Sequence, residues 1–284
     1  PREHFANVRA IVVDEVHAFA GDDRGWHLLA VLERLEKLAG HPIQRIGLSA
    51  TVGNPDDLLR WLQGSGAGDR PSSVIAPDVV AQAGRPPGDV TLDHVGSLAN
   101  AAKDISMLHV GEKRLVFCES RREVEELARS LRERDITTFV SHSSLSIDER
   151  RRAEQAFAEA RDCVIVSTST LELGIDVGDL DRVIQINSPR TVASFLQRLG
   201  RTGRRHGSTR NALFLTTTDD GLLQAAGLLL LWSRGYVEPV SAPPSPRHIA
   251  AQQVIALCLQ EHRIGANVWS EWWHGLPVFD DDAK

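Results

Sequence analysis

The sequence predicts an α/β protein whose strands form parallel sheets in two domains, and three observations carry that prediction. Short apolar runs rich in Val and Ile alternate with segments of helical hydrophobic spacing, the pattern of βαβ units. Apolar residues make up 42% and charged residues 25% of the chain, as in globular proteins. The 284 residues suffice for two domains of ordinary size.

The first predicted domain covers residues 1–84. Two apolar runs of the type seen in buried parallel strands lie in it: Val8–Asp14 and Gln44–Ala50. Between them, leucines at helical spacing predict a helix that ends near Gly40. Asn54 is expected to cap a further helix, with a proline at its first position. A stretch rich in Gly, Ser and Pro places the domain boundary near Gly84–Gly88.

The second predicted domain covers residues 85–236 and repeats strand and helix more regularly. Its expected strands are Lys113–Cys118, Thr137–Ser141, Asp162–Ser167, Arg182–Ile186 and Arg210–Thr216. Its expected helices are Ser120–Arg134, Ser146–Ala160, Arg190–Arg204 and Asp219–Arg234. Ser146 and Glu149 have the spacing of a capping box. Residues 237–284 begin with a Pro-rich connector and then a helical segment, which we expect to open a third unit.

Composition excludes several classes of protein. No apolar run approaches the roughly 18 residues of a membrane span, and no signal peptide is visible, so we expect no membrane partner. The three cysteines are far apart and form no CxxC pair, so we expect no zinc site and no disulfide framework. The expected location is cytoplasmic. Because the chain starts at Pro1 and has a single Met, we expect it to be a piece of a longer protein.

The charge is unevenly distributed along the chain. The net charge is −6, yet the stretch from Val183 to Thr218 has six arginines and no acidic residue, so the remainder carries −12. A local basic patch on an acidic protein attracts the phosphates of nucleotides or nucleic acids. We therefore expect a phosphate-bearing partner at this stretch.

Polar residues follow the predicted strands at their carboxyl ends, where ligands bind in parallel sheets. Asp14 and Glu15 directly follow the first strand, and two adjacent carboxylates there can take Mg²⁺ through water and activate an attacking water. A solvated turn with a helix-capping Asp remains the alternative interpretation. After the second strand, the hydroxyls of Ser49 and Thr51 lie at the position expected of a neighbouring strand end.

Two further motifs lie in the second domain. In Gln197–Arg204 (QRLGRTGR), guanidinium groups can clamp the γ-phosphate of a nucleotide, and the glycines allow close backbone approach. The alternative is a solvated basic helix end. Thr168–Asp176 follows a strand, and its hydroxyls suit a nucleic-acid phosphate. Asp176, which comes after Gly174, suits a ribose hydroxyl. The alternative for Gly174–Asp176 alone is a simple turn.

In this order, the motifs resemble those of the superfamily 2 helicases over about residues 8 to 216. Asp14–His17 is similar to motif II, Ser49–Thr51 to motif III, Lys113–Arg121 to motif IV, Thr168–Asp176 to motif V and Gln197–Arg204 to motif VI. Details that resemble the Lhr (large helicase-related) group are Val13–Phe19, Gly25–Leu28, Ser144–Ser146, Leu171–Val177 and Pro246–Ile255. The chain departs from that group at Ser141 and Ser143, which replace His and Gly, and at Arg204, which replaces His.

The resemblance implies two RecA-like domains, the first incomplete, followed by the start of a winged-helix-like domain. ATP and Mg²⁺ are the implied cofactors, bound between the two domains. Asp14 would hold Mg²⁺ through water and Glu15 would be the catalytic base. The residues implied to couple the nucleotide site to the nucleic acid are His17, Ser49 and Thr51.

The resemblance assigns the remaining site residues to the second domain. Arg201 and Arg204 would be catalytic and reach ATP. Further nucleotide contacts are implied for Gly174, Asp176, Gln197 and Arg198. Contacts with the nucleic-acid backbone are implied for Ser120, Arg121, Ser144 and Thr168.

The implied function is 3′-to-5′ translocation and unwinding driven by ATP. The implied partner is single-stranded DNA or a DNA/RNA duplex with a single-stranded tail, RNA:DNA hybrids included. The chain has no GxxxxGK[ST] phosphate-binding loop, and only thirteen residues precede Asp14, so we expect it to be inactive alone. Two alternatives stay open: a non-catalytic nucleic-acid-binding or interaction module with a RecA-like fold, and a translocase that does not separate strands.

Overall fold

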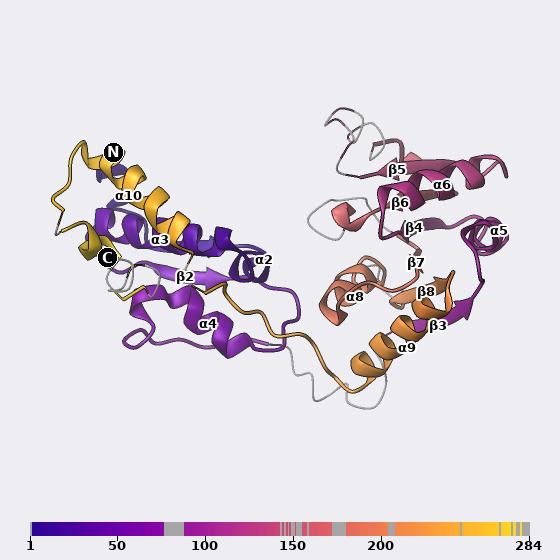
Figure 1. Ribbon diagram of the computed structural model, residues 1–284, viewed down its shortest axis with the longest axis horizontal. Coiled ribbons are helices and arrows are strands. Elements are labelled where there is room, and N and C mark those ends of the chain that lie inside the picture. Colours follow the sequence, from indigo (N-terminus) through magenta and orange to yellow (C-terminus); the bar gives the residue numbers. More distant parts are fainter. Residues whose placement is uncertain are drawn as a thin grey trace. The chain divides into compact units, whose positions relative to one another are not determined.

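The computed structural model divides the chain into two compact units, which are described separately (Figure 1). Unit 1 comprises Pro1–Pro77 and Glu238–Lys284, and unit 2 comprises Asp78–Val237. The structure describes residues 2–284 except for these positions: 77–87, 143, 145, 147, 149, 150, 152–154, 158, 172–179, 204–207, 245, 267, 274, 277, 278 and 280–284.

Unit 2 is built on a parallel sheet of six strands in the order β3-β8-β7-β4-β6-β5. The strands are β3 (Asp89–His94), β4 (Lys113–Phe117), β5 (Thr138–Ser141), β6 (Cys163–Ser167), β7 (Arg182–Ile186) and β8 (Asn211–Thr216). β4 pairs with β6 on one side and with β7 on the other, so it lies in the interior of the sheet. All neighbouring strands are parallel, so their carboxyl ends meet at one edge.

Helices cover both faces of this sheet (Figure 1). They are α5 (Leu98–Met107), α6 (Arg121–Arg132), α8 (Val192–Leu199) and α9 (Asp219–Ser233), with a 3₁₀ turn, η3, at Ser169–Leu171. Successive residues of β4 point to opposite faces: Leu115 and Phe117 pack with α8 and α9, whereas Val116 packs with α5 and α6. Unit 2 therefore has a hydrophobic core on each side of its sheet, as a parallel sheet requires.

Unit 1 contains a two-stranded parallel sheet of β1 (Ala10–Val13) and β2 (Gln44–Gly47) within its described residues. Its helices are α1 (Arg2–Phe5), α2 (Val16–Ala20), α3 (Asp23–Ala39), α4 (Pro55–Gln63) and α10 (Arg247–Glu261), with 3₁₀ turns η1 (Gly64–Gly66) and η4 (Trp269–Trp272). We expected β1 to be buried on both faces, but Val12 is 58% exposed while Val13 is 7% exposed. One face of the strand is covered by the core of unit 1, and the other is open in the described structure.

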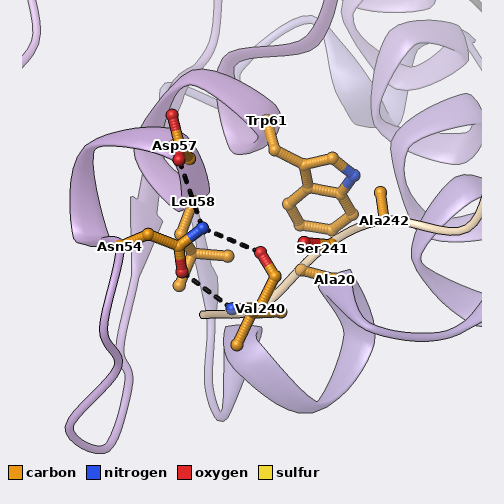
Figure 2. Close-up of a pocket in the computed structure, with 8 residues that line it drawn as sticks. All are labelled: Ala20, Asn54, Asp57, Leu58, Trp61, Val240, Ser241 and Ala242. Carbon is orange, nitrogen blue, oxygen red and sulfur yellow. Dashed lines mark hydrogen bonds between the residues drawn. The ribbon is translucent and has the colours of Figure 1, made fainter. Parts of the chain in front are cut away.

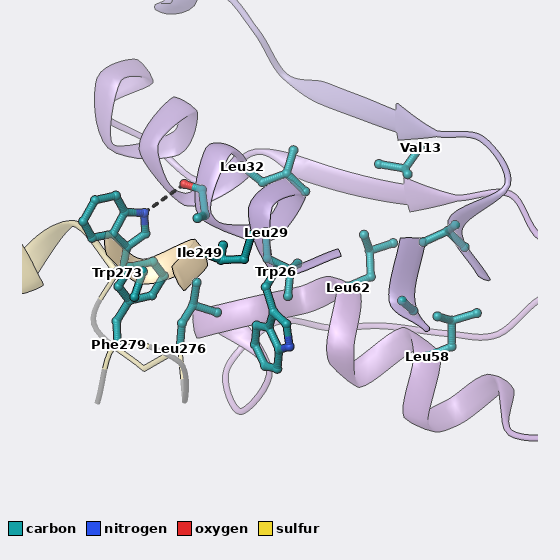
Figure 3. Close-up of a cluster of buried hydrophobic side chains, with 14 of the residues drawn as sticks. Val13, Trp26, Leu29, Leu32, Leu58, Leu62, Ile249, Trp273, Leu276 and Phe279 are labelled. Atoms are coloured by element: carbon teal, nitrogen blue, oxygen red, sulfur yellow. Dashed lines mark hydrogen bonds between the residues drawn. The ribbon is translucent and has the colours of Figure 1, made fainter. Parts of the chain in front are cut away.

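The C-terminal segment packs on α3, as Figure 3 shows. Trp273 is fully buried, stacks on Phe279 with ring centroids 4.4 Å apart, and donates its indole N–H to the carbonyl of Ala30 at 3.0 Å. We expected residues from 237 onward to begin a third unit. The described part of this segment instead belongs to unit 1, because its aromatic and aliphatic side chains complete the core formed by α3 and α4.

Most expected elements are present, with ends shifted by a few residues. The expected capping box at Ser146 and Glu149 lies outside the described residues in part, because Glu149 is not described. The structure adds β3 and α5, which we did not expect. In β3, the alternation of Val90 and Leu92 with polar residues was the available signal, but strand β3 is partnered by β8, which lies far along the chain.

Burial explains the state of two cysteines. Cys118 and Cys163 are free and buried, and burial raises the pKa of both thiols. A buried thiol with a raised pKa is a poor nucleophile, so these residues act as small core side chains. None of the described helices combines the length and the hydropathy needed to cross a membrane.

Candidate nucleotide and nucleic-acid sites

The acidic cluster of unit 1 lies where β1 and β2 end. Because the two strands are parallel and adjacent, their carboxyl ends meet, and the Val16 amide donates to the Leu48 carbonyl at 2.9 Å. Glu15 adopts a left-handed backbone conformation with φ 51°, which turns the chain sharply from β1 into α2. The Asp14 carboxylate accepts a hydrogen bond from the Glu15 amide at 2.9 Å. The turn is thus held by the residues proposed for catalysis.

His17 joins the two strand ends. Its Nδ1 lies 3.2 Å from the Ser49 hydroxyl, and its Nε2 lies 3.5 Å from the Glu15 carboxylate. Burial lowers the pKa of His17, although the neighbouring charges of Glu15 and Asp14 oppose that shift. The ring therefore favours the neutral form at neutral pH. The imidazole of His17 thus contacts both the end of β1 and the segment that follows β2.

Thr51 lies apart from this contact. It is exposed on the loop before α4, two residues beyond the Ser49 hydroxyl that meets His17. The structure therefore brings together four of the five expected residues in unit 1: Asp14, Glu15, His17 and Ser49.

The donor set at this turn fits a magnesium ion held through water. Asp14 is exposed, and the described residues contain no group of three or more His, Cys, Asp or Glu that could enclose a metal. Mg²⁺ keeps several of its waters and binds through one or two carboxylates plus substrate phosphates. When bound, the ion would neutralise phosphate charge. Asp14 would anchor its waters, and Glu15 would accept a proton from the attacking water.

In unit 2, motif VI begins in α8. Thr191 caps this helix by accepting a hydrogen bond from the Ser194 amide at 3.1 Å. Gln197 lies on the helix and is partly buried. Arg198 points into unit 2, where its guanidinium donates to the Gln185 side chain, lies 3.5 Å from the Glu119 carboxylate and stacks over the ring of Phe117. Arg198 is therefore an internal tie between α8 and the strands β4 and β7.

The turn after α8 carries Arg201. Its amide donates to the Arg198 carbonyl at 3.0 Å, and the next residue, Thr202, is buried. The Thr202 hydroxyl donates to the Leu199 carbonyl and accepts from the Asn211 amide at 2.9 Å, so it ties the turn to β8. Sequence reasoning missed Thr202, although its place inside the motif was a signal.

Gly203 needs to be glycine. Its φ is +70°, and a Cβ atom there would lie 2.6 Å from the Arg210 amide nitrogen. The absence of a side chain at Gly203 thus lets the turn pack closely against Arg210, the residue before β8. Three expected site residues lie outside the described residues: Gly174, Asp176 and Arg204.

The expected nucleic-acid contacts of unit 2 follow three adjacent strands, β4, β6 and β5, at the same edge of the sheet. Thr168 directly follows β6, and its amide donates to the Ser141 carbonyl at the end of β5. Ser120 follows β4. Its hydroxyl accepts from the Glu123 amide at 3.2 Å in a capping box, so this hydroxyl also serves to begin α6.

Arg121 and Ser144 contact each other directly, the guanidinium donating to the hydroxyl. Behind them lies His142, which is buried. Its Nε2 is 2.7 Å from the Glu125 carboxylate, and its Nδ1 accepts from the Ser144 amide at 3.3 Å. Sequence reasoning missed His142 and Glu125, because the contact joins a strand end to a helix seventeen residues earlier.

Comparison with known proteins identifies two domains in the chain. Residues 1–58 match the DEAD/DEAH box helicase family, and residues 98–206 match the helicase conserved C-terminal domain. The first match contains Asp14, Glu15 and His17, and the second contains Arg121, Arg198 and Arg201. The two matches thus divide the site residues between the two units in the same way as the structure does.

Curated relatives span nearly the whole chain. An Lhr helicase/uracil glycosylase of Escherichia coli is 32% identical, the match covering 98% of this chain and 22% of that protein. An Lhr helicase/probable uracil glycosylase of Mycolicibacterium smegmatis is 30% identical, covering 94% of this chain and 20% of the relative. An ATP-dependent helicase Lhr-Core of Methanothermobacter thermautotrophicus is 30% identical, and the match covers 91% of this chain and 31% of that protein. The chain thus spans about a fifth to a third of the length of these relatives.

A solved structure of the helicase Lhr of Mycobacterium smegmatis, bound to ssDNA and AMP-PNP, superposes on 98% of this chain and 37% of that one. The TM-score is 0.82 and the identity 31%. The DUF1998 helicase MrfA bound to DNA has the same fold, with a TM-score of 0.69 at 23% identity. The motifs, the placement of the site residues and these similarities agree: the chain belongs to the superfamily 2 DEAD/DEAH-box helicases, in the Lhr group.

Proposed function

We propose that this chain supplies part of an ATP-dependent motor that moves 3′-to-5′ along single-stranded DNA and unwinds the duplex ahead, with RNA:DNA hybrids as a further substrate. The observation that carries the proposal is the cluster at the ends of β1 and β2, where Glu15, His17 and Ser49 meet. This arrangement links a catalytic carboxylate to a second strand end through a neutral imidazole. That a similar Lhr helicase was solved with ssDNA and AMP-PNP supports the same partners here.

In the proposed reaction, the residues of unit 1 act on the γ-phosphate. Asp14 would hold Mg²⁺ through water, which would neutralise phosphate charge, and Glu15 would orient the attacking water and accept its proton. His17 and Ser49 transmit the state of this turn to the segment after β2, which includes Thr51.

The residues of unit 2 supply the positive charge. Arg201 and Arg204 stabilise the charge that develops on the phosphoryl group, and Asp176 with Gly174 contacts the ribose. Arg198 and Gln197 lie on α8, and Arg201 lies on the turn that follows this helix. The buried guanidinium of Arg198 keeps the helix fixed to β4 and β7, so the following turn has a defined position.

The nucleic acid would lie along the carboxyl edge of the unit 2 sheet. Arg121, Ser144 and Thr168 offer donors to backbone phosphates there, together with the backbone at Ser120. Contacts of this type read no sequence, and their affinity falls steeply with salt.

The 284 residues alone are expected to be inactive. They contain no GxxxxGK[ST] sequence, so the lysine and backbone amides that hold the β- and γ-phosphates in P-loop enzymes are missing. The same observation favours the second candidate, a non-catalytic nucleic-acid-binding module.

The test is an unwinding assay with the full-length protein encoded by the gene. Duplexes with a 3′ tail, with a 5′ tail and with blunt ends are incubated with ATP and Mg²⁺, and ATP hydrolysis is followed in parallel. We expect hydrolysis that depends on DNA, and unwinding of the 3′-tailed duplex only. Unwinding of the 5′-tailed duplex would contradict the direction. Hydrolysis without strand separation would indicate a translocase, and tight binding without hydrolysis would indicate the binding module.

A further inference from the structure

The chain re-enters unit 1 at Glu238, and the connector of residues 238–243 then runs beside the segment that follows motif III. The Gly53 amide donates to the Glu238 carbonyl at 3.2 Å. The side chain of Asn54 makes two hydrogen bonds with the backbone of Val240: its Oδ1 accepts from the amide at 2.7 Å, and its Nδ2 donates to the carbonyl at 2.9 Å (Figure 2). The Asn54 amide group thus binds both the N–H and the C=O of Val240, as a neighbouring strand would.

Asn54 makes these bonds instead of capping α4. It occupies the N-cap position, but its side chain forms no capping hydrogen bond, and its backbone has φ −135° and ψ 64°. An asparagine cap ordinarily accepts from the amide two or three residues on, and this contact stabilises a helix by about 1 kcal/mol. The Asn54 side chain has been diverted from that favourable local contact toward Val240. The geometry therefore marks the connector as its partner.

Packing covers the connector only in part at this point: Val240 and Ala242 lie against the core of unit 1 and are partly buried. A hollow of about 270 Å³ remains between it and the helices α2 and α4, lined in part by Ala20, Trp61 and Ala242 (Figure 2). The indole nitrogen of Trp61 is buried there, and within the described residues it has no hydrogen-bond partner. Directional hydrogen bonds add to this packing and give the connector a defined register.

Two side chains of unit 1 supply such bonds. Asn54 binds the connector at Val240, and the Trp26 indole N–H donates to the Pro243 carbonyl at 2.7 Å. Trp26 is buried in α3, whereas Asn54 lies three residues beyond Thr51 and five beyond Ser49, the hydroxyl that contacts His17. Of these two side chains, only Asn54 is continuous with the motif III segment, and the amide of its neighbour Gly53 binds the connector beside it at Glu238.

We propose that Asn54 is a positioning residue that couples the motif III segment to the connector. Only Glu238 and Pro239 lie between the end of unit 2 and Val240, the residue that Asn54 holds. A displacement of the strand ends during the nucleotide cycle would therefore reach the chain that leads out of unit 2 through this side chain. The inference rests on the proposed function, because it concerns how hydrolysis is converted into movement.

The test compares full-length wild type with Asn54→Ser, Asn54→Asp and the matched variant Asp56→Asn, which changes an exposed residue of the same helix. Serine and aspartate are good N-caps, so both substitutions retain or improve capping of α4. Serine is too short to span both groups of Val240, and aspartate cannot donate to the carbonyl. Both variants lose at least one bond with Val240 and the 3.2 Å bond from the Asn54 Nδ2 to the Asp57 carboxylate, and capping of α4 offsets part of that loss. Urea unfolding of each variant therefore accompanies the test, and only variants that are folded under the assay conditions are compared.

The two readouts are base pairs unwound per ATP hydrolysed and hydrogen exchange at the Val240 amide. We expect both Asn54 variants to keep the kcat and KM for ATP hydrolysis while the unwinding yield per ATP falls by about threefold or more. Exchange at Val240 should accelerate in Asn54→Ser, and Asp56→Asn should match wild type in both measurements.

An unchanged yield per ATP in Asn54→Ser, or unchanged exchange at Val240, would overturn the inference while leaving the proposed function intact. If wild type itself hydrolyses no ATP with DNA present, the proposed function fails and the coupling role fails with it. The activity of wild type thus separates the two failures.

Discussion

Strands of similar apolar composition have different surroundings in the two units. In unit 2, Val116 and Phe117 of β4 are fully buried, each on its own face of the sheet. In unit 1, Val12 of β1 is 58% exposed and Ile46 of β2 is 37% exposed, while the opposite face of β1 packs on the core. The difference lies in the covering elements: unit 2 has helices on both faces of six strands, and unit 1 covers one face of two.

The two units therefore differ in what stabilises their sheets. A two-stranded sheet contributes little stability on its own, so unit 1 depends on the packing of α3, α4 and the C-terminal segment. The turn proposed for catalysis is nevertheless held by hydrogen bonds at Glu15, His17 and Ser49. We expect the sheet of unit 1 to open more readily than that of unit 2.

The largest expected effect on stability comes from truncating a buried strand residue, compared with truncating an exposed one. Phe214 of β8 is fully buried against Phe195, with ring centroids 5.4 Å apart, so Phe214→Ala should lower the free energy of unfolding of unit 2 by about 3–5 kcal/mol. The matched change Val12→Ala in unit 1 should stay within about 0.5 kcal/mol. Urea unfolding with hydrogen exchange assigned to each unit measures both. A comparable loss in the two variants would show that Val12 is buried in solution.

A smaller loss should follow from removing a buried cation of unit 2, Arg198. Arg198→Met keeps much of the aliphatic volume but leaves Gln185 and Glu119 without their shared donor, which should cost about 2–3 kcal/mol of unit 2 stability. Arg161→Ala, a change at an exposed arginine, is the control and should have no measurable effect. If Arg198→Met unfolds at the same urea concentration as wild type, Arg198 does not tie α8 to the sheet.

The smallest effect is a pH dependence confined to unit 1. Burial lowers the pKa of His17, so the unfolded chain binds this proton more tightly than the folded one. The stabilisation is present above about pH 6.5, the ordinary pKa of histidine, and is lost as the pH falls below it. The unfolding midpoint of unit 1 should therefore drop between pH 7.5 and 5.5. In His17→Gln that drop should be smaller; an equal drop would assign it to other groups.

The sequence predicted the parts of this structure that depend on local pattern. Apolar runs gave the strands of both units, and the equal spacing of strand and helix gave the parallel sheet. The meeting of Glu15 and Ser49 around His17 followed from one rule, that adjacent parallel strands end at the same edge.

Contacts between distant segments could not be predicted in the same way. The pairing of β3 with β8 and the pairing of Asn54 with Val240 both join segments more than a hundred residues apart. Asn54 also shows a conflict that only the fold resolves: its sequence position favours a helix cap, and tertiary hydrogen bonds redirect the side chain. The exposure of Val12 was missed because an apolar pattern does not say which elements cover it.

The most direct test of the proposed motor is the rate of DNA-stimulated ATP hydrolysis by the full-length protein and its Glu15→Gln variant at saturating ATP. Glutamine preserves the shape of the turn but cannot accept the proton of the attacking water. We predict a fall of about a hundredfold or more in kcat with DNA binding retained, and a wild-type rate in the Asp56→Asn control. A wild-type rate in Glu15→Gln would contradict the assignment of the catalytic turn at the end of β1.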